Sequence, residues 1–345
     1  MPRASRDTRS ADHTVRTTCS DCLPDVSRRQ FLQQMGVSAA LLGSLPFAGP
    51  LTGAYAAPSL SSTAETSAQK LFETLTEEQK KVICFPFEHA SRQKISANWA
   101  VTQPAIHEPF FTKEQRGLIA ESLRGITSED GHTRFLEQME FDDGGWDRYH
   151  IALFGTPESG QFQWMLTGRH NTLRADGSST PGAAFGGPIV YGHGEEEAKE
   201  NLFYYQTQQA NEVFRALDPQ QVKQALLLNA PGETQVLLQG EGKAFPGISA
   251  ASLSSDQQTL LSSVIRTLLA PYREEDVDAA MACLEKTGGV KSLSMAFYQQ
   301  GDLNNDKEWD IWRIEGPTFV CHFRGAPHVH AYLNVGTQML PTAKP

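Results

Sequence analysis

One five-residue pattern occurs four times in this 345-residue chain and indicates where helices begin. Each copy has an apolar residue, a residue suited to capping a helix, two further residues and a glutamine. The copies are Leu75–Gln79, Phe111–Gln115, Leu217–Gln221 and Leu253–Gln257. In such a capping box the cap side chain accepts the N–H three residues on, and the glutamine accepts the cap's own N–H. Apolar residues at helical spacing follow, so each copy predicts a helix.

A fifth helix and several strands are predicted between and after these boxes. The helix runs over residues 274–286 and ends at Gly288-Gly289. Alternating apolar residues predict strands over 150–154, 162–173, 293–299, 309–314, 318–323 and 328–335. The joins 156–160 and 302–306 are rich in turn residues and are typical of hairpin loops.

The order helix, helix, hairpin occurs twice, which suggests an internal duplication. The two hairpins also share a motif, because Trp164-Met165-Leu166-Thr167-Gly168 aligns with Trp312-Arg313-Ile314-Glu315-Gly316. The two repeats would cover about 69–173 and 207–335. The predicted fold class is α+β, with the hairpins paired in one antiparallel sheet and helices packed on one side of it.

Residues 1–56 have the organisation of a twin-arginine signal peptide that is removed on export. Ser27-Arg28-Arg29-Gln30-Phe31-Leu32 is followed by a short apolar run and by Ala54-Tyr55-Ala56, a small-x-small cleavage site. The run is too short to cross about 30 Å of hydrocarbon. We therefore expect a periplasmic or secreted protein with a flexible start at 57–68, one α+β domain at 69–336 and a tail at 337–345.

Charge and cysteine content narrow the possible partners. The net charge of −10 argues against binding to nucleic acid or to an anionic membrane surface. No segment after the leader is apolar enough to be a membrane span. Cys19 and Cys22 leave with the leader, and the remaining Cys84, Cys283 and Cys321 are too few for a disulfide framework.

A His-Val-His triplet near the C-terminus is the strongest candidate for chemistry. Side chains alternate between the faces of a strand, so His328 and His330 point the same way, with Cα atoms roughly 6.5 Å apart. Both imidazoles can then reach one metal ion at about 2.1 Å. A hydrogen-bonded structural role is the alternative for each histidine, and a third ligand is needed to complete a site.

The predicted third and fourth ligands are His170, at the end of a strand, and His193, in a glycine-rich loop. Two or three histidines from separate strands are typical of Zn²⁺ or Cu²⁺ sites. His322, in contrast, is expected to be a hydrogen-bonded core histidine. Four residues are predicted to bind a small-molecule ligand: Arg169, Gly186, Gly187 and Tyr191. Glycine lets the backbone approach a ligand closely, and arginine suits an acidic group.

Several of these motifs together resemble the exported bacterial family known as domain of unknown function family 3500. They are Leu153–Pro157, Trp164 with Gly168-Arg169-His170, Ala184–Pro188, Gly316–Phe319 and His328-Val329-His330. The resemblance extends from about Ala68 to Val335. Members often carry Gly-His-His where this chain has Gly168-Arg169-His170, so one histidine fewer is present here. The resemblance implies a functional histidine cluster but no established activity.

Two hypotheses of function follow. The first is a metal-dependent enzyme, hydrolytic or oxidative, built on His170, His193, His328 and His330, with a catalytic base that the sequence does not identify. The alternative is a periplasmic protein that binds a small ligand without catalysis, through Arg169, the glycine loop and nearby aromatic residues. The sequence specifies neither the metal nor the substrate.

Overall fold

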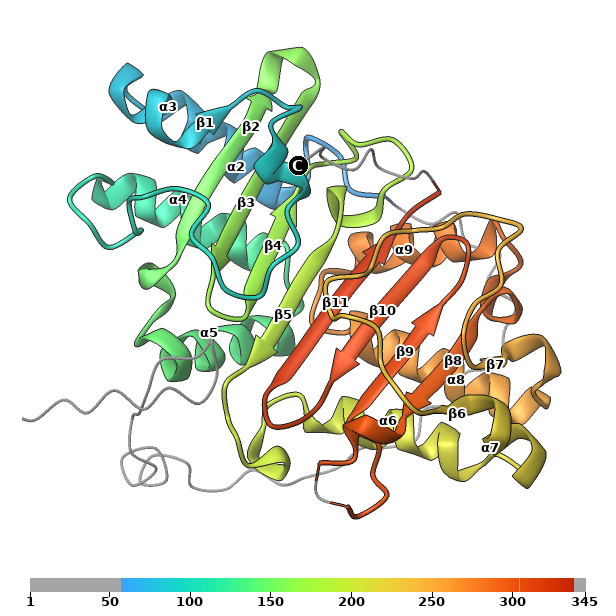
Figure 1. Ribbon diagram of the computed structural model, residues 1–345. Helices are drawn as coiled ribbons and strands as arrows, with labels where there is room; N and C mark the ends of the chain where they lie inside the picture. The colour runs from blue at the N-terminus through green and yellow to red at the C-terminus, as the bar shows by residue number, and fades with distance from the viewer. Residues whose placement is uncertain (1–56, 304, 338–345) are drawn as a thin grey trace, which may run out of the picture. The chain divides into compact units, whose positions relative to one another are not determined.

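A mixed sheet of 11 strands forms the centre of the computed structural model, which describes residues 57–303 and 305–337 (Figure 1). The strands are β1 (Cys84–Phe85), β2 (His150–Thr156), β3 (Gln161–Gly168), β4 (Asn171–Ala175), β5 (Ile189–His193), β6 (Leu226–Leu227), β7 (Ile248–Ser249), β8 (Ser294–Tyr298), β9 (Ile311–Glu315), β10 (Phe319–Arg324) and β11 (Val329–Val335). Their order is β1-β2-β3-β4-β5-β11-β10-β9-β8-β6, and β7 pairs with β8. The predicted signal peptide, and the tail from residue 338, lie outside the described residues.

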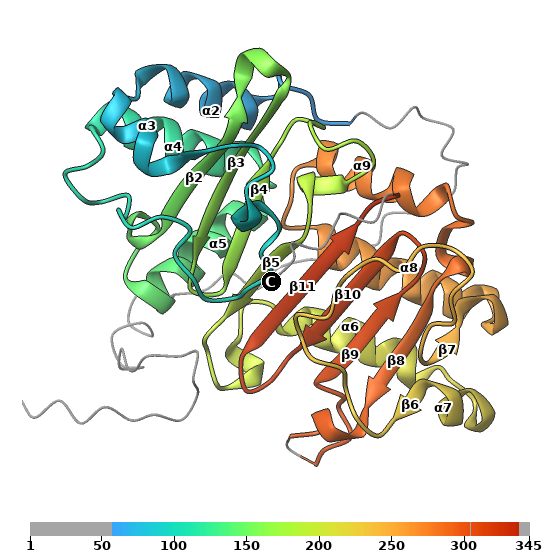
Figure 2. The same ribbon diagram turned by 45° about the horizontal axis from the view of Figure 1, so that its top comes forward.

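Helices cover one face of the sheet, and two long irregular segments cross the other (Figures 1 and 2). The helices are α2 (Thr63–Thr74), α3 (Glu77–Ile83), α4 (Lys113–Gly125), α5 (Glu129–Asp143), α6 (Tyr204–Arg215), α7 (Pro219–Ala225), α8 (Ser255–Leu269) and α9 (Glu274–Glu285). The irregular segments are residues 86–105, in front of the first half of the sheet, and residues 228–247, in front of the second. This arrangement confirms the α+β class. Among the described helices, none combines the length and the apolar character that a membrane span needs.

All four predicted capping boxes are present, at the starts of α3, α4, α7 and α8. Their glutamines do more than cap. The amides of Gln79 and Gln115 donate to each other's side-chain oxygens at 2.9 and 3.0 Å. Gln221 and Gln257 form the same reciprocal pair at 3.0 and 2.7 Å. Each pair therefore joins two helix starts that are far apart in the sequence.

The two halves of the described chain present their elements in the same order. In the first half two helices lead into the two-residue β1, and α4, α5 and four strands follow. In the second half α6 and α7 lead into the two-residue β6, and α8, α9 and four strands follow, with the short β7 as an addition. Both β1 and β6 are parallel to their neighbours, and β5 pairs with β11 where the halves meet.

Several expectations about individual elements were wrong. The predicted strand 162–173 is two strands, because the chain reverses at Arg169 and His170 and Gly168 pairs with Asn171. The hairpins do not pair directly, since β5 lies between them within what we expected to be a loop.

We predicted no helix over α2, α5 or α6; α6 has no side-chain cap, and Ser128 caps α5 without a glutamine partner. The segment 57–68, expected to be flexible, includes the first half of α2.

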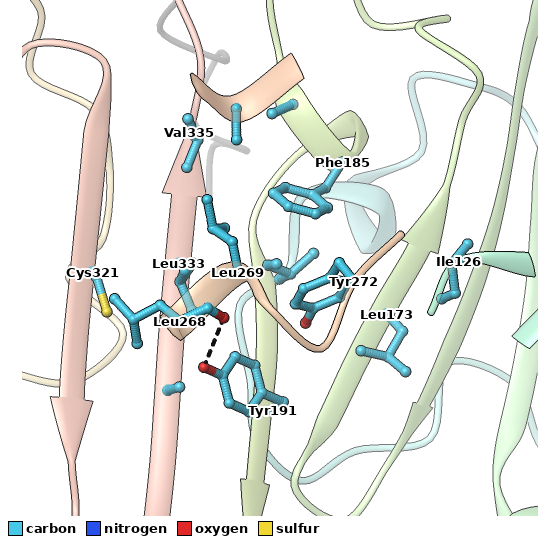
Figure 3. Packing of buried hydrophobic residues seen from close by; sticks show 14 of the residues in the cluster. Ile126, Leu173, Phe185, Tyr191, Leu268, Leu269, Tyr272, Cys321, Leu333 and Val335 are labelled. Carbon is cyan, nitrogen blue, oxygen red and sulfur yellow. Dashed lines mark hydrogen bonds between the residues drawn. The ribbon is translucent and has the colours of Figure 1, made fainter. Parts of the chain in front are cut away.

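The main hydrophobic core lies between the sheet and the helices. Figure 3 shows part of it, where Tyr272 packs between Tyr191 of β5 and Phe185. The Tyr191 hydroxyl donates to the carbonyl of Leu268 at 3.1 Å. Two smaller apolar clusters lie on the opposite face, under the irregular segments. The three cysteines of the described residues are free thiols.

Candidate metal centre

Three of the predicted ligands meet at one point. His170, His328 and His330 are at most 3% exposed, and one ring nitrogen from each lies within 4.8 Å of the other two. Their ring centroids are 5.0 Å apart for His170 and His330, and 5.7 Å for His170 and His328. Histidines separated by about 160 residues in the sequence therefore form one cluster, here called the histidine trio.

The local backbone explains how the trio forms. His330 is the second residue of β11 and His328 directly precedes the strand, so the two lie two residues apart and share a face. His170 occupies the turn between β3 and β4 with a φ of 61°, a left-handed conformation. Gly192 lies in β5 and is paired with His330 of β11. A side chain at Gly192 would meet Val329 O at 2.1 Å, so the close approach of this carbonyl requires glycine, and His170 Cβ lies 3.4 Å from the same position.

Asp142, at the end of α5, orients His170. Its carboxylate accepts a hydrogen bond from His170 Nδ1 at 2.7 Å, from Gln138 at 2.6 Å and from the Gly194 N–H at 3.0 Å. Burial opposes ionisation of Asp142, but the hydrogen bond from His170 outweighs it and keeps the pKa below its usual value. Because Nδ1 donates to Asp142, Nε2 of His170 presents its lone pair.

Glu233 has the same relation to His330. Its Oε2 lies 2.9 Å from His330 Nδ1, and its Oε1 lies 2.7 Å from Arg324 Nε. Burial opposes ionisation of Glu233, but the hydrogen bond from His330 and the charge of Arg324 lower its pKa to about 2. Burial also lowers the pKa of His330 to about 4, so this imidazole is neutral near pH 7. A neutral imidazole is the form that binds a metal ion.

His328 completes the trio. Its Nε2 lies 3.7 Å from Glu196 Oε1, and that carboxylate is largely exposed. Burial and the neighbouring His170 lower the pKa of His328. The trio therefore offers three imidazole donors, two of which have a carboxylate at Nδ1.

This donor set fits a transition-metal ion. Three imidazoles with outer carboxylates are the usual surroundings of Zn²⁺ and suit Cu²⁺ also. Imidazole nitrogens around a tetrahedral Zn²⁺ are separated by roughly 3.3 Å, so the rings must approach by about 1.5 Å at most. Arg324 must also withdraw, because its terminal nitrogen lies 3.1 Å from His330 Nε2.

His193 does not belong to the trio. It is paired with Val329 across the strands, so it faces the helices, and its ring contacts Phe141 at 4.7 Å. Its Nδ1 accepts the N–H of Leu202 at 3.2 Å, and its buried Nε2 has no partner among the described residues. Burial lowers the pKa of His193 to about 4. The structure thus separates one predicted ligand from the other three.

The predicted ligand-binding residues are also dispersed. Arg169 lies beside His170 in the turn, and its guanidinium donates to the carbonyl of Asp142 at 3.3 Å. Gly186, with a φ of 70°, packs against Gln163 and Asp176. Gly187 follows it, before β5 begins.

Tyr191 is fully buried on the helix side of β5, where its hydroxyl lies 3.0 Å from Gln206 Oε1. Gly186 and Gly187 precede β5, whereas Gly192 lies within it beside the trio. Binding of a ligand by Gly186, Gly187 and Tyr191 stays a prediction.

Sequence reasoning missed Asp142, Glu233 and Arg324. Asp142 occurs in Phe141-Asp142-Asp143-Gly144-Gly145, where a helix ends, and nothing local distinguishes it from Asp143. Glu233 lies in the irregular segment 228–247. Arg324 pairs with His330 across β10 and β11, so only a prediction of strand register could have found it.

Comparisons with known proteins identify the family and give no relative of known function. No curated protein matches the chain significantly, and no solved structure does. A family model described as "Protein of unknown function (DUF3500)" matches residues 59–335, which is most of the chain. Together with the motifs around His170 and the His328-Val329-His330 triplet, this match shows that the chain belongs to the DUF3500 family.

Proposed function

We propose that the histidine trio binds one transition-metal ion, Zn²⁺ or Cu²⁺, and that the protein is a metal-dependent enzyme with hydrolytic or oxidative activity. The observation that carries the proposal is the convergence of three buried imidazole nitrogens within 4.8 Å of one another. Three buried imidazoles brought together from separate parts of the chain are expensive to assemble without a ligand to hold.

The carboxylates behind two of the rings support the metal assignment. Asp142 and Glu233 contact Nδ1 of His170 and of His330, which orients each ring and leaves its Nε2 as the nitrogen that can bind a metal ion. Such outer carboxylates raise the basicity of ligating histidines. A bound Zn²⁺ would lower the pKa of a water molecule for hydrolysis, and copper would supply redox chemistry.

The proposal is tested by metal analysis of the untagged protein after incubation with Zn²⁺ or Cu²⁺ and gel filtration. We expect about one ion per chain, and close to none in the His328→Ala/His330→Ala variant and in His170→Ala. His132→Ala, which changes a histidine of α5 outside the trio, should bind like the parent. Unchanged stoichiometry in the double variant would rule out the site.

A second candidate function, non-catalytic binding of a small ligand, is favoured by Arg324. Its terminal nitrogen lies 2.6 and 3.1 Å from the two nitrogens of His330. A guanidinium at this position suits an acidic ligand as well as it hinders a metal ion. Thermal denaturation with candidate ligands, with and without a chelator, separates the two functions. Stabilisation that the chelator leaves unchanged favours the binding protein.

We also infer that the chain arose by duplication of a helix-and-strand unit. The matching order of elements in the two halves supports this origin, as does the agreement between the two glutamine pairs, each 36 residues apart in sequence. Trp164 and Trp312, aligned in the shared motif, are both fully buried. Under this proposal the trio formed where the halves meet, with His170 from one and His328 and His330 from the other.

Export by the twin-arginine route, to the periplasm or beyond, is the location we propose. The motif at Ser27–Leu32 and the small residues at Ala54–Ala56 support it. Changing Arg28 and Arg29 to lysine should leave the precursor inside the cell with its leader uncleaved, which immunoblotting of cell fractions detects.

A further inference from the structure

A row of polar side chains extends from the trio across the sheet, on the face opposite the helices. His330 on β11 is paired with Arg324 on β10. Two residues along, Tyr332 is paired with His322, and His322 is paired with Arg313 on β9. Residues paired directly across strands share a face, so these side chains adjoin one another.

The segment 228–247 covers this row. Its Glu233 reaches His330, its Gln235 carbonyl accepts from Arg313 at 2.7 Å, and its Gln239 donates to Glu315 at 2.9 Å. It has no regular secondary structure, and within it only Val236 and Leu238 are buried apolar residues. Irregular segments of this length in compact domains are commonly functional.

Under this cover the hydrogen-bonding groups are incompletely paired. Arg313 NH1, His322 Nδ1 and the Tyr298 hydroxyl are buried and have no partner among the described residues. These side chains are between 1 and 3% exposed. A buried polar group without a partner costs about 1–3 kcal/mol, so a ligand that accepts hydrogen bonds from these groups would recover part of that cost.

The first half of the sheet shows that a covering segment can satisfy such a row. Arg174 of β4 is fully buried on the same face, beneath residues 86–105. Its guanidinium donates to the carbonyls of Arg92, Lys94 and Pro188 and to Gln163. Burial on this face therefore does not by itself leave a guanidinium unpaired.

We propose that Arg313, His322 and Tyr298, with Arg324 beside them, bind the acidic group of a small molecule, a carboxylate or another oxyanion. Arg313 Nε is paired with Glu315 at 2.7 Å, which fixes the guanidinium and leaves NH1 as a directed donor. The hydroxyl of Tyr298 and a protonated Nδ1 of His322 supply neutral donors. Oxyanions accept several hydrogen bonds at once, which suits donors on the neighbouring strands β8, β9 and β10.

The position of the row indicates the size of the molecule. Arg313 is two strands away from His330, a separation of roughly 10 Å at the usual strand spacing. A molecule with its acidic group on the row could place another group at the trio. Its role as a substrate rests on the proposed function, whereas binding of the acidic group does not require a metal ion.

Sulfate is a suitable probe, titrated calorimetrically into chelator-treated full-length protein at constant ionic strength. We expect saturable binding at one site, weakened at least tenfold in His322→Leu and in Arg313→Lys. His322→Leu removes an unpaired polar group, and Arg313→Lys keeps the charge beside Glu315, so both variants should fold. Arg266→Gln, an exposed change on α8, is the matched control and should bind like the parent.

The same titration distinguishes this proposal from the metal site. The His328→Ala/His330→Ala variant should retain sulfate binding even if it loses the ion. Binding should also slow hydrogen exchange of backbone amides in residues 229–247, because the ligand would lie beneath them. Absence of saturable binding in the parent protein, or equal affinity in the parent, His322→Leu and Arg313→Lys, would overturn the proposal and leave the metal site untouched.

Discussion

At the scale of single residues, Asp142 is the most informative side chain of the candidate site. It is buried, it accepts from His170, Gln138 and Gly194, and its charge is preserved by those bonds. Its role is to hold one imidazole in the tautomer that can bind a metal. The carboxylate is therefore expected to act on metal affinity without touching the metal.

Asp142→Asn should lower zinc affinity by about 10–100-fold, because the amide keeps the shape but not the charge behind His170. Competition with a chromogenic chelator measures the change. Asp143→Asn is the matched control, since that exposed carboxylate neighbours Asp142 in the sequence, and it should leave affinity within about twofold. Equal losses in both variants would contradict a specific role for Asp142.

Asp310 makes a separate prediction about pH. Burial and the acidic neighbours Asp306 and Glu308 raise its pKa to about 7 from a usual 3.8. The pKa of Asp310 is higher in the folded than in the unfolded state, so the protonated carboxyl favours folding. This contribution to stability is complete below about pH 4 and is lost as pH rises to about 7.

Asp310→Asn should therefore raise the free energy of unfolding, relative to the parent protein, by more at pH 8 than at pH 5. The difference between the two pH values should be on the order of 2 kcal/mol. Asparagine keeps an oxygen to accept the Leu303 N–H that Asp310 now accepts at 3.2 Å. Urea unfolding of both proteins at the two pH values gives the difference. A stability difference independent of pH would show that Asp310 titrates normally.

The sequence predicted the residues whose placement depends on local geometry. His328 and His330 share a face because they are two apart on a strand, and this needs no tertiary information. His170 was predicted as a ligand, although the strand predicted over 162–173 is in fact two strands with His170 in the turn between them. Asp142 and Glu233 could not be predicted, because each reaches the trio from another segment of the chain. Arg324 lies only six residues from His330, and finding it required the register of β10 and β11.

At the scale of elements, the reciprocal glutamine pairs extend the capping box beyond its helix. Gln115 caps α4, donates to Gln79 and also donates to the Thr74 carbonyl at 3.0 Å. Gln257 likewise donates to the Ala216 carbonyl at 2.7 Å. The capping-box motif, which occurs four times, therefore specifies both where helices begin and which helix starts lie together.

Gln115→Glu should destabilise the fold by about 1–3 kcal/mol, because glutamate preserves the cap but cannot donate to Thr74 or Gln79. Gln257→Glu should cost a similar amount if the two halves are equivalent. Glu114→Gln, an exposed change one residue earlier, is the control for the altered charge. Urea unfolding at pH 7 measures all three, and a cost below about 0.5 kcal/mol for both glutamate variants would contradict the structural role.

A substitution at Gly186 tests whether this glycine is required for packing or for the candidate site. Its φ is 70°, and a Cβ there would lie 2.3 Å from Gln163 Nε2 and 2.4 Å from Asp176 Cγ. Gly186→Ala should thus cost about 3 kcal/mol of stability and leave metal stoichiometry unchanged. Gly160→Ala shares the positive φ of 71° but has open space, so it should cost about 1 kcal/mol. Loss of metal binding in Gly186→Ala alone would assign this glycine to the site.

Elements with a strong local signal were predicted, and those fixed by packing were not. The capping boxes determined α3, α4, α7 and α8, whereas α6 begins without a side-chain cap. The strand β5 escaped prediction because Gly192 and Gly194 suggest a loop. Those glycines are required by the close approach of Val329 and Asp142, which only the folded sheet creates.

At the scale of the whole molecule, the trio joins the two halves of the described chain. His170 lies between β3 and β4 in the first half, His330 lies in the last strand of the second, and His328 directly precedes that strand. An ion held by all three would connect the halves at the point where β5 pairs with β11. Metal binding should consequently stabilise the fold as a unit.

Zinc at 100 times its dissociation constant should raise the free energy of unfolding by about 2.7 kcal/mol, because it binds the folded state alone. Denaturant titrations with zinc and with a chelator measure the gain. His170→Ala should abolish it, and His132→Ala should retain it in full. A gain that survives in His170→Ala would place the stabilising ion elsewhere.

Both outer strands of the large sheet, β1 and β6, are only two residues long, and each runs parallel to its neighbour. An edge that offers so short a ladder gives a strand from another molecule little to pair with. The wide, largely buried sheet of this protein is thereby guarded against self-association by strand addition, a safeguard that depends on where its edges stop and not on surface charge.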